Sequence, residues 1–328
     1  MVEARKSSQP YAHAQQLPCF SDDHPKAKGT YLQIDPSELD SEKPQLFYSH
    51  PNGEIYVGDA ASWLRSLTSG SVDLIFADPP YNVKKAEWDT FESQEEYVRW
   101  SITWIEEAAR VLKPNGSLYV CGYSEILSDL KLPALRFFRG CKWLIWHYKN
   151  KANLGSDWGR SHESILHFRK SREFTFNIDD IRIPYGNHTL KYPDHPQAET
   201  SQYGKGSNKN HLWQPHPDGA KPRDVIEVPT TCNGMDEKTP HPTQKPEELV
   251  RKFILASSNP GDLVIDPFLG SGTTSVVSEQ LKRKWKGCDL SLEYCGWAAN
   301  RIELVKDQPI ERWKQYDLEN EMRRKSIR

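Results

Sequence analysis

The sequence has no long apolar run, and its cysteines are few and scattered. No stretch approaches the ~18 uninterrupted apolar residues that a membrane span needs, and the N-terminus lacks the basic start and apolar run of a signal peptide. The six cysteines form no C-x-x-C pair and no Cys/His cluster at metal-ligand spacing. These absences predict a cytoplasmic protein with reduced thiols, no membrane partner and no bound metal.

An excess of basic residues is also missing. The formal net charge is -2, whereas nucleic-acid binders usually carry a basic surface. This counts only weakly against DNA, because a cleft can be locally basic inside a nearly neutral protein. Two basic clusters could line such a cleft, although each is equally well explained as solvated surface charge. They are Lys149, Lys151, Arg160, Arg169, Lys170 and Arg172, and Lys282, Arg283 and Lys284.

Five segments differ in their sequence pattern. Residues 1–45 are polar and have no sustained apolar period, which predicts a loosely ordered N-terminal leader. Two ordered stretches, 46–170 and 239–305, flank residues 171–238, where Pro, Asn, His, Gly and Tyr leave only short apolar runs. This middle segment is too long for an ordinary connection, and its interleaved aromatic residues favour an ordered insert. The charged tail at 306–328 is predicted to be a solvated helix.

Strand-like and helix-like segments alternate in the ordered stretches. A buried strand at 72–77 runs directly into Asp78, and Ser93 and Glu96 form a capping box for the helix that follows. This alternation predicts an α/β fold with a doubly wound, Rossmann-like, mostly parallel sheet that binds ligands at the carboxyl ends of its strands. The other predicted strands are 55–57, 117–121, 143–146, 164–168, 263–265 and 285–288.

A glycine-rich turn follows the predicted strand at 263–265. Gly270-Ser271-Gly272-Thr273-Thr274 lies between Asp266 and a predicted helix, so the backbone can approach a ligand closely at the helix N-terminus. It is not a nucleotide P-loop, because no lysine precedes Thr273 and the glycine spacing differs from a Walker A motif. Roughly twenty residues further on, a strand ends in Asp289, where Rossmann-type sites hold ribose hydroxyls. A tight turn without a ligand is the alternative, and Asp289 favours the cofactor site.

The turn Asp78-Pro79-Pro80-Tyr81 suits the alkylation of an exocyclic amine on a nucleobase. Such an amine is a poor nucleophile because its lone pair is delocalised into the ring. The carboxylate of Asp78 and the backbone carbonyl of Pro79 can accept its hydrogen bonds and favour a more tetrahedral nitrogen. Pro80 stiffens the turn, and Tyr81 offers a ring face to a base swung out of the duplex. The alternative is a diproline that only ends a strand, and the flanking acid and tyrosine count against it.

Together these motifs resemble those of the DNA amino-methyltransferases that carry D-P-P-Y and F-x-G-x-G motifs. The resemblance runs from about Ile55 to Ile302, and further matches are Gly58-Asp59 and His241-Pro242-Thr243-Gln244-Lys245-Pro246. The catalytic motif precedes the cofactor motif, an order that marks the permuted β group of this family. The resemblance implies the class I methyltransferase fold, S-adenosyl-L-methionine as cofactor, and residues 171–238 as the target-recognition region.

The resemblance also implies which residues bind the cofactor. It places Asp289 at the ribose hydroxyls and Asp59 near the adenine. The other implied residues are Asp266, Phe268, Gly270 and Gly272 at the methionine end, with Ser271, Thr273 and Thr274 in the same loop, and Thr243, Gln244 and Lys245 beside the carboxylate end.

Methylation of adenine at N6 is the first interpretation, because in this family Asp as the first residue of the catalytic motif is commoner in adenine enzymes, whereas the cytosine N4 enzymes more often begin it with Ser. Transfer to N4 of cytosine stays open, since the same chemistry serves both amines. Attack at C5 of cytosine would need a thiolate, and the only Pro-Cys pair, Pro18-Cys19, lies in the polar leader. An RNA or protein amine methyltransferase could share both motifs, but their order and the long insert favour DNA. A non-catalytic DNA-binding relative would not need the intact Asp78-to-Tyr81 turn.

The resemblance further implies partners and a location. The expected substrate is double-stranded DNA, and a cognate restriction endonuclease is a candidate partner. The expected location is the cytoplasm of a prokaryote, in association with the nucleoid. Monomer and homodimer both stay open.

Overall fold

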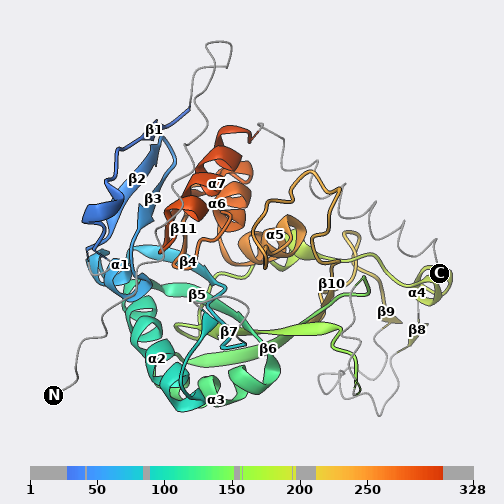
Figure 1. Cartoon of the computed structure of the whole chain (residues 1–328). Helices are drawn as coiled ribbons and strands as arrows, with labels where there is room; N and C mark the ends of the chain where they lie inside the picture. Colours follow the sequence, from blue (N-terminus) through green and yellow to red (C-terminus); the bar gives the residue numbers. More distant parts are fainter. Residues whose placement is uncertain are drawn as a thin grey trace.

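The computed structural model describes residues 28–40, 43–83, 89–150, 156, 158–193, 195–196 and 212–305 of the 328-residue chain (Figure 1). The predicted charged tail at 306–328 lies outside these residues, as does most of the leader. Cys19 and Lys151 lie outside them as well. In the described part of the chain, no helix is long and apolar enough to cross a membrane.

One sheet of ten strands runs through the described residues. From one edge to the other its strands are β1 (Thr30–Tyr31), β2 (Gln45–His50), β3 (Gly53–Val57), β12 (Lys284–Asp289), β11 (Leu263–Asp266), β4 (Val72–Ala77), β5 (Leu112–Gly122), β7 (His162–Arg169), β6 (Gly140–His147) and β10 (Val225–Glu227). The central strands from β3 to β5 in this order are parallel, and so are β6 and β10. The strands β1, β2 and β7 pair antiparallel with their neighbours.

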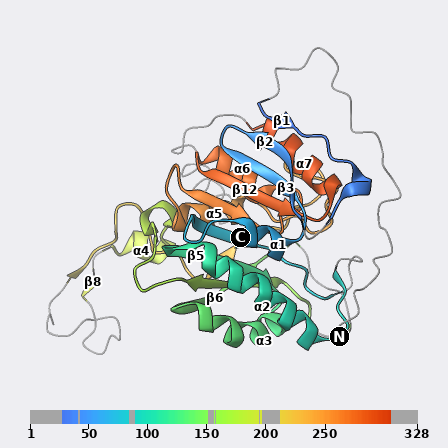
Figure 2. The ribbon, with the colours of Figure 1, turned by 90° about the vertical axis from the view of Figure 1, so that its left-hand side faces the viewer.

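Helices cover both faces of this sheet. The described helices of the two layers are α1 (Ala60–Ser66), α2 (Gln94–Val111), α3 (Ser124–Ala134) with the 3-10 turn η3 (Leu135–Phe137), α5 (Glu247–Ser257), α6 (Thr273–Gln280) and α7 (Leu292–Glu303). Figures 1 and 2 show α2 and α3 on one side of the sheet and α5, α6 and α7 on the other. In β4, Ile75 and Ala77 pack in one core cluster with α2, whereas Leu74 and Phe76 pack in the other with α5. The strand is buried on both faces, which explains its apolar run from Leu74 to Ala77. The predicted doubly wound α/β fold is confirmed.

The N-terminal end of α2 forms as its sequence predicts. Ser93 Oγ accepts a hydrogen bond from the backbone N–H of Glu96 at 3.1 Å, and the Glu96 carboxylate accepts one from the backbone N–H of Glu92 at 2.8 Å. Two of the backbone donors at this end are therefore satisfied by side chains.

Part of the predicted leader is ordered against the C-terminal helix. The strand β1 adds to the sheet edge, and η1 (Pro36–Glu38) follows it. The backbone N–H of Gly29 and the hydroxyl of Tyr48 both donate to Glu303 Oε1, at 2.8 and 2.7 Å. The prediction of a loosely ordered segment up to residue 45 therefore does not hold for these described residues, because their order comes from contacts with α7 at the other end of the chain.

The segment 171–238 is partly integrated into the main sheet. Its described elements are η4 (Ile178–Ile181), α4 (Asn187–Lys191), the paired strands β8 (His195–Pro196) and β9 (Leu212–Trp213), and β10. The strand β10 extends the sheet beside β6, and the Asn177 side chain donates to the carbonyls of Leu255 and Ser258 at the end of α5, at 3.1 and 3.0 Å. The described parts of this segment are thus anchored near one end to α5 and near the other to β6.

The order of the strands creates a switch point between β4 and β11. From β4 the chain continues toward β5, whereas from β11 it continues toward β12, on the opposite side. Ligands of doubly wound sheets bind where the connections diverge in this way, outside the carboxyl ends of the strands. Asp78 directly follows β4 and Asp266 ends β11, so the fold brings both motifs to this crevice.

Candidate active site

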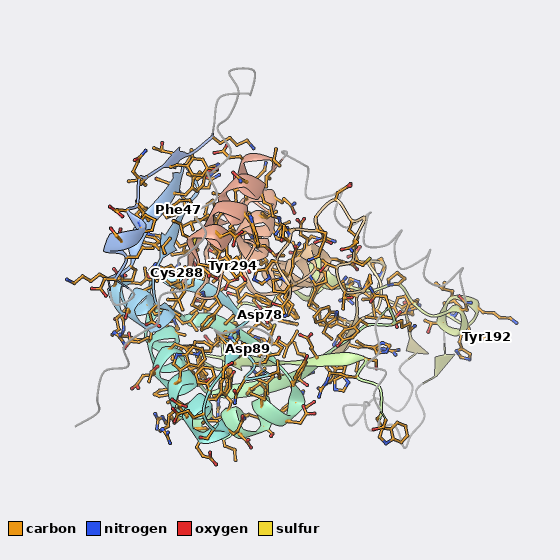
Figure 3. All side chains as sticks on the ribbon, viewed as in Figure 1. Phe47, Asp78, Asp89, Tyr192, Cys288 and Tyr294 are labelled. Carbon is orange, nitrogen blue, oxygen red and sulfur yellow. The ribbon has the colours of Figure 1, made fainter. Side chains whose placement is uncertain are left out.

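A cavity of about 430 Å³ lies at the switch point. Both motifs contribute to it, and Figure 3 shows Asp78 near the middle of the molecule, between the two helical layers. The predicted site residues that line the cavity are Asp59, Asp78, Pro79, Pro80, Tyr81, Thr243, Gln244, Lys245, Asp266, Phe268, Gly270, Ser271, Thr273, Thr274 and Asp289. Of the predicted residues, Gly272 alone is not among its lining.

The carboxylate of Asp78 is surrounded by charged and polar groups. Lys245 Nζ lies 2.6 Å from Asp78 Oδ2 and 3.4 Å from Glu163 Oε2. The hydroxyl of Tyr81 lies 2.7 Å from Asp78 Oδ1 and 3.0 Å from Glu163 Oε2. Burial lowers the pKa of Lys245, but the carboxylates of Asp78 and Glu163 outweigh burial and raise the pKa of its ammonium group. The cluster therefore holds two carboxylates around one ammonium.

Tyr81 is not an open stacking surface in this structure. Its side chain is 8% exposed, and its ring meets the ring of Tyr123 edge-on with 5.1 Å between the centroids. Lys245 Nζ lies 5.2 Å from the centre of the Tyr81 ring. Burial, followed by the charge of Asp78, raises the pKa of the Tyr81 hydroxyl well above its ordinary value, so the group is a neutral donor. A flipped base would need this ring to be uncovered first.

The turn from Asp78 to Tyr81 is held by a buried carboxylate that no sequence motif marks. Asp89 is 1% exposed, and its oxygens accept from the backbone N–H groups of Tyr81 at 2.6 Å and Val83 at 3.2 Å. Asn82 has a φ of 57°, a conformation that Asn tolerates better than most residues, and its side chain accepts from the N–H of Phe91 at 2.9 Å. These bonds fix the turn beyond what its two prolines supply.

Two acids, the buried Asp266 and the half-buried Asp289, organise the glycine-rich loop. Asp266 accepts from the backbone N–H of Phe268 at 2.9 Å and from the hydroxyl of Thr274 at 2.6 Å. Asp289 accepts from the N–H of Gly270 at 2.8 Å and from that of Ser291 at 2.9 Å. Burial raises the pKa of Asp266 to about 7 and that of Asp289 to about 6. Each oxygen retains a further lone pair, so both carboxylates can still accept from a ligand in the cavity.

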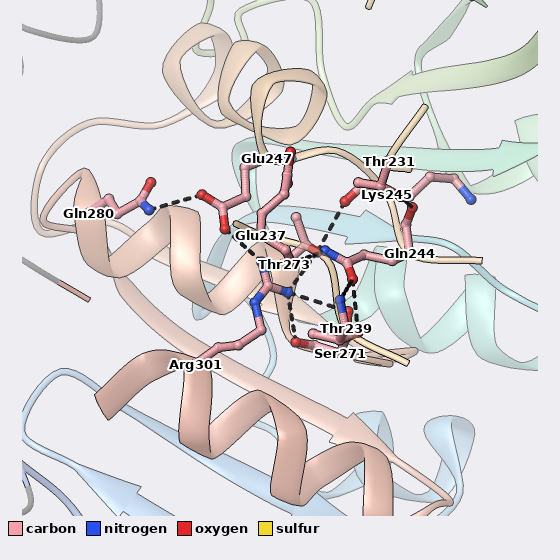
Figure 4. A network of polar contacts seen from close by, with 10 residues as sticks. All are labelled: Thr231, Glu237, Thr239, Gln244, Lys245, Glu247, Ser271, Thr273, Gln280 and Arg301. Carbon is pink, nitrogen blue, oxygen red and sulfur yellow. Dashed lines mark hydrogen bonds and ion pairs between the residues drawn. The ribbon is translucent and has the colours of Figure 1, made fainter. Parts of the chain in front are cut away.

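Gly272 has a packing role in place of the predicted lining role. Its φ is 80°, and a Cβ built there would lie 2.5 Å from the Cβ of Ala298. The N-cap of α6 thus packs directly on α7, which turns Gly272 away from the cavity. Arg301 of α7 then bonds the carbonyl of Ser271 at 2.9 Å and the carboxylate of Glu247 at 2.6 Å (Figure 4). This network fixes the loop to α5 and α7.

The residues predicted beside the carboxylate end of the cofactor are held in different ways. The side-chain amide of Gln244 is bonded within its own loop, to Thr239 and to the carbonyl of Glu237. The ammonium group of Lys245 points to Asp78. The Asp59 side chain, which the resemblance places near the adenine, caps α1 by accepting from the N–H of Ser62 at 2.8 Å. All three residues line the cavity, but Lys245 contacts Asp78 and Glu163 in this geometry.

Among the cavity residues that were not predicted as part of the site are Glu163, His241 and Tyr294. Glu163 is the second residue of β7, which enters the site because β7 runs antiparallel to β5 and starts at the catalytic edge. His241 packs edge-on against Tyr294 with 4.5 Å between ring centroids, and burial lowers the pKa of His241 to about 4. Its imidazole is therefore neutral at pH 7. In the described residues, no group of His, Cys, Asp or Glu side chains is arranged to hold a metal ion.

The chemistry of the cavity fits a cationic nucleoside cofactor. Acids at the ends of β11 and β12 lie beside the glycine-rich loop, where backbone can approach a ligand closely. A doubly wound sheet with this loop and these acids at its switch point defines the class I S-adenosylmethionine-dependent methyltransferase fold. Among solved structures, the cytosine-N4-specific PvuII DNA methyltransferase has a TM-score of 0.57 at 20% identity, covering 82% of this chain and 93% of that one. The M1.HpyAVI–SAM complex has a TM-score of 0.50 at 24% identity, covering 77% and 100%.

The chain belongs to the DNA methylase family, whose family profile matches residues 72–300. The Type II methyltransferase M1.MboII of Moraxella bovis is 34% identical over 270 residues, which are 76% of this chain and 98% of that protein. The DNA adenine methyltransferase YhdJ of Escherichia coli K12 is 34% identical over 259 residues, which are 77% and 84%. The predicted family is confirmed, and the protein is a DNA methyltransferase.

Proposed function

We propose that the protein transfers a methyl group from S-adenosyl-L-methionine to the N6 amine of an adenine flipped out of double-stranded DNA. The observation that carries this proposal is the Asp78 carboxylate, which faces the same cavity as the glycine-rich loop. The named activity of YhdJ favours adenine. Transfer to cytosine N4 is the second candidate, because the PvuII enzyme has a similar fold and the acceptor chemistry serves both amines.

The residues of the catalytic turn would prepare the amine. Asp78 and the carbonyl of Pro79 accept its hydrogen bonds, which frees the nitrogen lone pair for attack. Asp89 and the prolines keep these acceptors in place before the base arrives, so little reorganisation is needed during the reaction. Tyr81 contributes a ring face once the base displaces its present neighbours.

The cofactor would lie along the ends of β11 and β12. When bound, it supplies an activated methyl group on a sulfonium centre. Asp266 holds its methionine end together with Phe268 and the loop that contains Gly270 and Ser271, and Asp289 holds its ribose hydroxyls. Asp59 and Thr243 also line the cavity.

Identification of the product tests the choice of base. Purified protein is incubated with duplex DNA and labelled S-adenosyl-L-methionine, and the DNA is digested to nucleosides and analysed by mass. We expect N6-methyladenine. N4-methylcytosine would overturn the base assignment and leave the chemistry in place, whereas unlabelled DNA would contradict the proposed function.

Cofactor affinity should depend on pH through Asp266. Its pKa is raised from 3.8 to about 7, so its contribution to folding stability is full below about pH 4 and is lost as pH rises through about 7. Binding of a cationic cofactor depends on pH in the opposite direction, because the positive charge of the cofactor favours the ionised carboxylate. We expect the Kd measured by calorimetry to rise as pH falls below 7, by at most about tenfold per pH unit for one proton.

The variant Asp266→Asn is the matched control for this pH dependence. In this variant the pH dependence of the Kd near pH 7 should be lost. The weaker pH dependence that arises from Asp289, whose pKa is about 6, should remain. A wild-type Kd that does not vary with pH would contradict ionisation of Asp266 on binding.

The segment 171–238 is proposed to select the DNA sequence. Its strand β10 pairs with β6. The indole of Trp146, which lies on β6 and lines the cavity, donates to the carbonyl of Val228 in this segment at 2.7 Å. Exchange of this segment for that of a relative should change which sites are methylated without changing the modified atom, as read by sequencing that detects methylated bases. An unchanged site would remove the segment from recognition.

A partner endonuclease and the location in the cell also belong to the proposal. The name Type II methyltransferase of the relatives supports the expectation that a cognate restriction endonuclease accompanies this enzyme. Association with the nucleoid follows from a DNA substrate. Both stay predictions, and co-expression with a neighbouring nuclease, with survival of the host as readout, tests the first.

A further inference from the structure

The cluster around Asp78 contains one acid more than the amine-binding chemistry uses. Asp78 accepts hydrogen bonds from the target amine in the proposed function, and Lys245 neutralises one carboxylate. Glu163 is not required for either task, yet its Oε2 lies 3.0 Å from the Tyr81 hydroxyl and 3.4 Å from Lys245 Nζ. With both carboxylates ionised and Lys245 charged, the cluster carries one net negative charge.

The Tyr81 hydroxyl lies between the two carboxylates. It is 2.7 Å from Asp78 Oδ1 and 3.0 Å from Glu163 Oε2. A phenol has a single hydrogen and two acceptor lone pairs, so it can donate to one carboxylate while it accepts from the other once that one is protonated. This is the arrangement that a proton relay requires.

Methyl transfer creates a proton that must leave the site. As the amine nitrogen forms a bond to the methyl carbon, the carbon–sulfur bond breaks with its electron pair going to sulfur, and the nitrogen releases one proton in the same step. Asp78 is the nearest acceptor to that nitrogen in the proposed function. A proton that stayed on Asp78 would weaken its ion pair with Lys245, because a neutral carboxyl no longer attracts the ammonium.

We propose that Glu163 is the final protein acceptor of this proton and that the hydroxyl of Tyr81 relays it from Asp78. Asp78 gives the proton to the Tyr81 oxygen, and Tyr81 gives its own hydrogen to Glu163 Oε2. Tyr81 ends the step neutral, and Asp78 returns to the carboxylate. The Glu163 side chain is 14% exposed, so its proton can pass to water in the cavity. This proposal rests on the proposed function.

The groups around Glu163 are mostly protonated already, so Glu163 is the group that can accept the relayed proton. The titratable or charged groups that face it are Asp78, Tyr81, Cys121, Tyr148 and Lys245. Burial raises the pKa of the Cys121 thiol well above its ordinary value and raises the pKa of Tyr148 to about 12. Both groups are therefore already protonated at neutral pH, and Lys245 is charged.

Substitutions at Glu163 and Tyr81 test the relay in the full-length protein. Glu163→Gln keeps the side-chain volume and removes the proton acceptor, and we expect the single-turnover rate of methyl transfer to fall by about 10²-fold. Tyr81→Phe keeps the ring and removes the relay hydroxyl, and the double variant should be no slower than the slower single variant. Calorimetry should show unchanged binding of S-adenosyl-L-methionine, because the acids that hold it are elsewhere.

Rescue by formate separates a proton acceptor from a structural residue. In Glu163→Ala, added formate should restore the rate by replacing the missing carboxylate, and the rescue should weaken in acid as formate is protonated. The matched control is Glu54, which accepts from the Tyr56 hydroxyl at 2.7 Å and pairs with Lys286 at 2.7 Å outside the cavity. Glu54→Ala should keep the wild-type rate and gain nothing from formate.

The outcomes distinguish failure of the relay from failure of the proposed function. A wild-type rate for Glu163→Gln, or a slow Glu163→Ala that formate does not rescue, overturns the relay while wild-type methylation stands. Absence of methyl transfer by the wild type overturns the proposed function itself.

Discussion

Replacement of Asp78 by alanine is expected to reduce methyl transfer to DNA by about 10²- to 10⁴-fold. The substitution removes the carboxylate that faces the cavity, so the target amine loses its acceptor and keeps its lone pair in the ring. Cofactor affinity should persist, because Asp266 and Asp289 are held by bonds within their own loops. The measurements are incorporation of labelled methyl into DNA and calorimetric titration with S-adenosyl-L-methionine.

The fold should survive this substitution. Lys245 is 6% exposed and would be costly to leave unpaired, but Glu163 lies 3.4 Å away and still compensates its charge. The matched control is Asp73→Ala on the strand β4, which removes a pair with Lys113 at 2.8 Å and the acceptor of the Leu263 N–H at 2.9 Å, both outside the cavity. Asp73→Ala should keep activity. Equal loss of cofactor affinity in Asp78→Ala would contradict separate roles for the two motifs.

The convergence of the two motifs could be predicted because it follows from strand direction. Asp78 and Asp266 each follow a buried apolar run, and the carboxyl ends of parallel strands meet at one edge. Local sequence encodes both features, so the long stretch of chain between the two acids does not obscure them. The structure places them on neighbouring strands, β4 and β11.

The sequence did not indicate Glu163 as a site residue, because its position in the cavity depends on a strand that runs antiparallel to its neighbours. The predicted strands at 143–146 and 164–168 have no helical pattern between them, which is the sign of an antiparallel pair. With that pairing, the start of the second strand lies at the catalytic edge, and Glu163 enters the cavity. The contact of Lys245 with Asp78, 167 positions earlier, has no local signal at all. The same holds for Glu303, which orders the start of the described chain.

Replacement of Gly272 by alanine should destabilise the protein by about 2–5 kcal/mol. A left-handed φ costs a non-glycine residue about 1–2 kcal/mol, and the φ here is 80°. Overpacking adds about 1–3 kcal/mol, because the new Cβ would lie 2.5 Å from the Cβ of Ala298. The free energy of unfolding, measured by chemical denaturation, gives the total.

The variant Gly261→Ala separates the two terms. Gly261 has a φ of 86°, and a Cβ added there would meet no heavy atom within 4 Å, so only the backbone term applies, and the expected loss is about 1 kcal/mol. Gly272→Ala should also weaken cofactor binding, because a shift of α6 from α7 moves the loop that Arg301 holds through Ser271. Gly261→Ala should leave that affinity intact. Equal losses of stability in the two variants would show that α6 and α7 can separate at little cost, and the loop would then owe its shape to Asp266 and Asp289 alone.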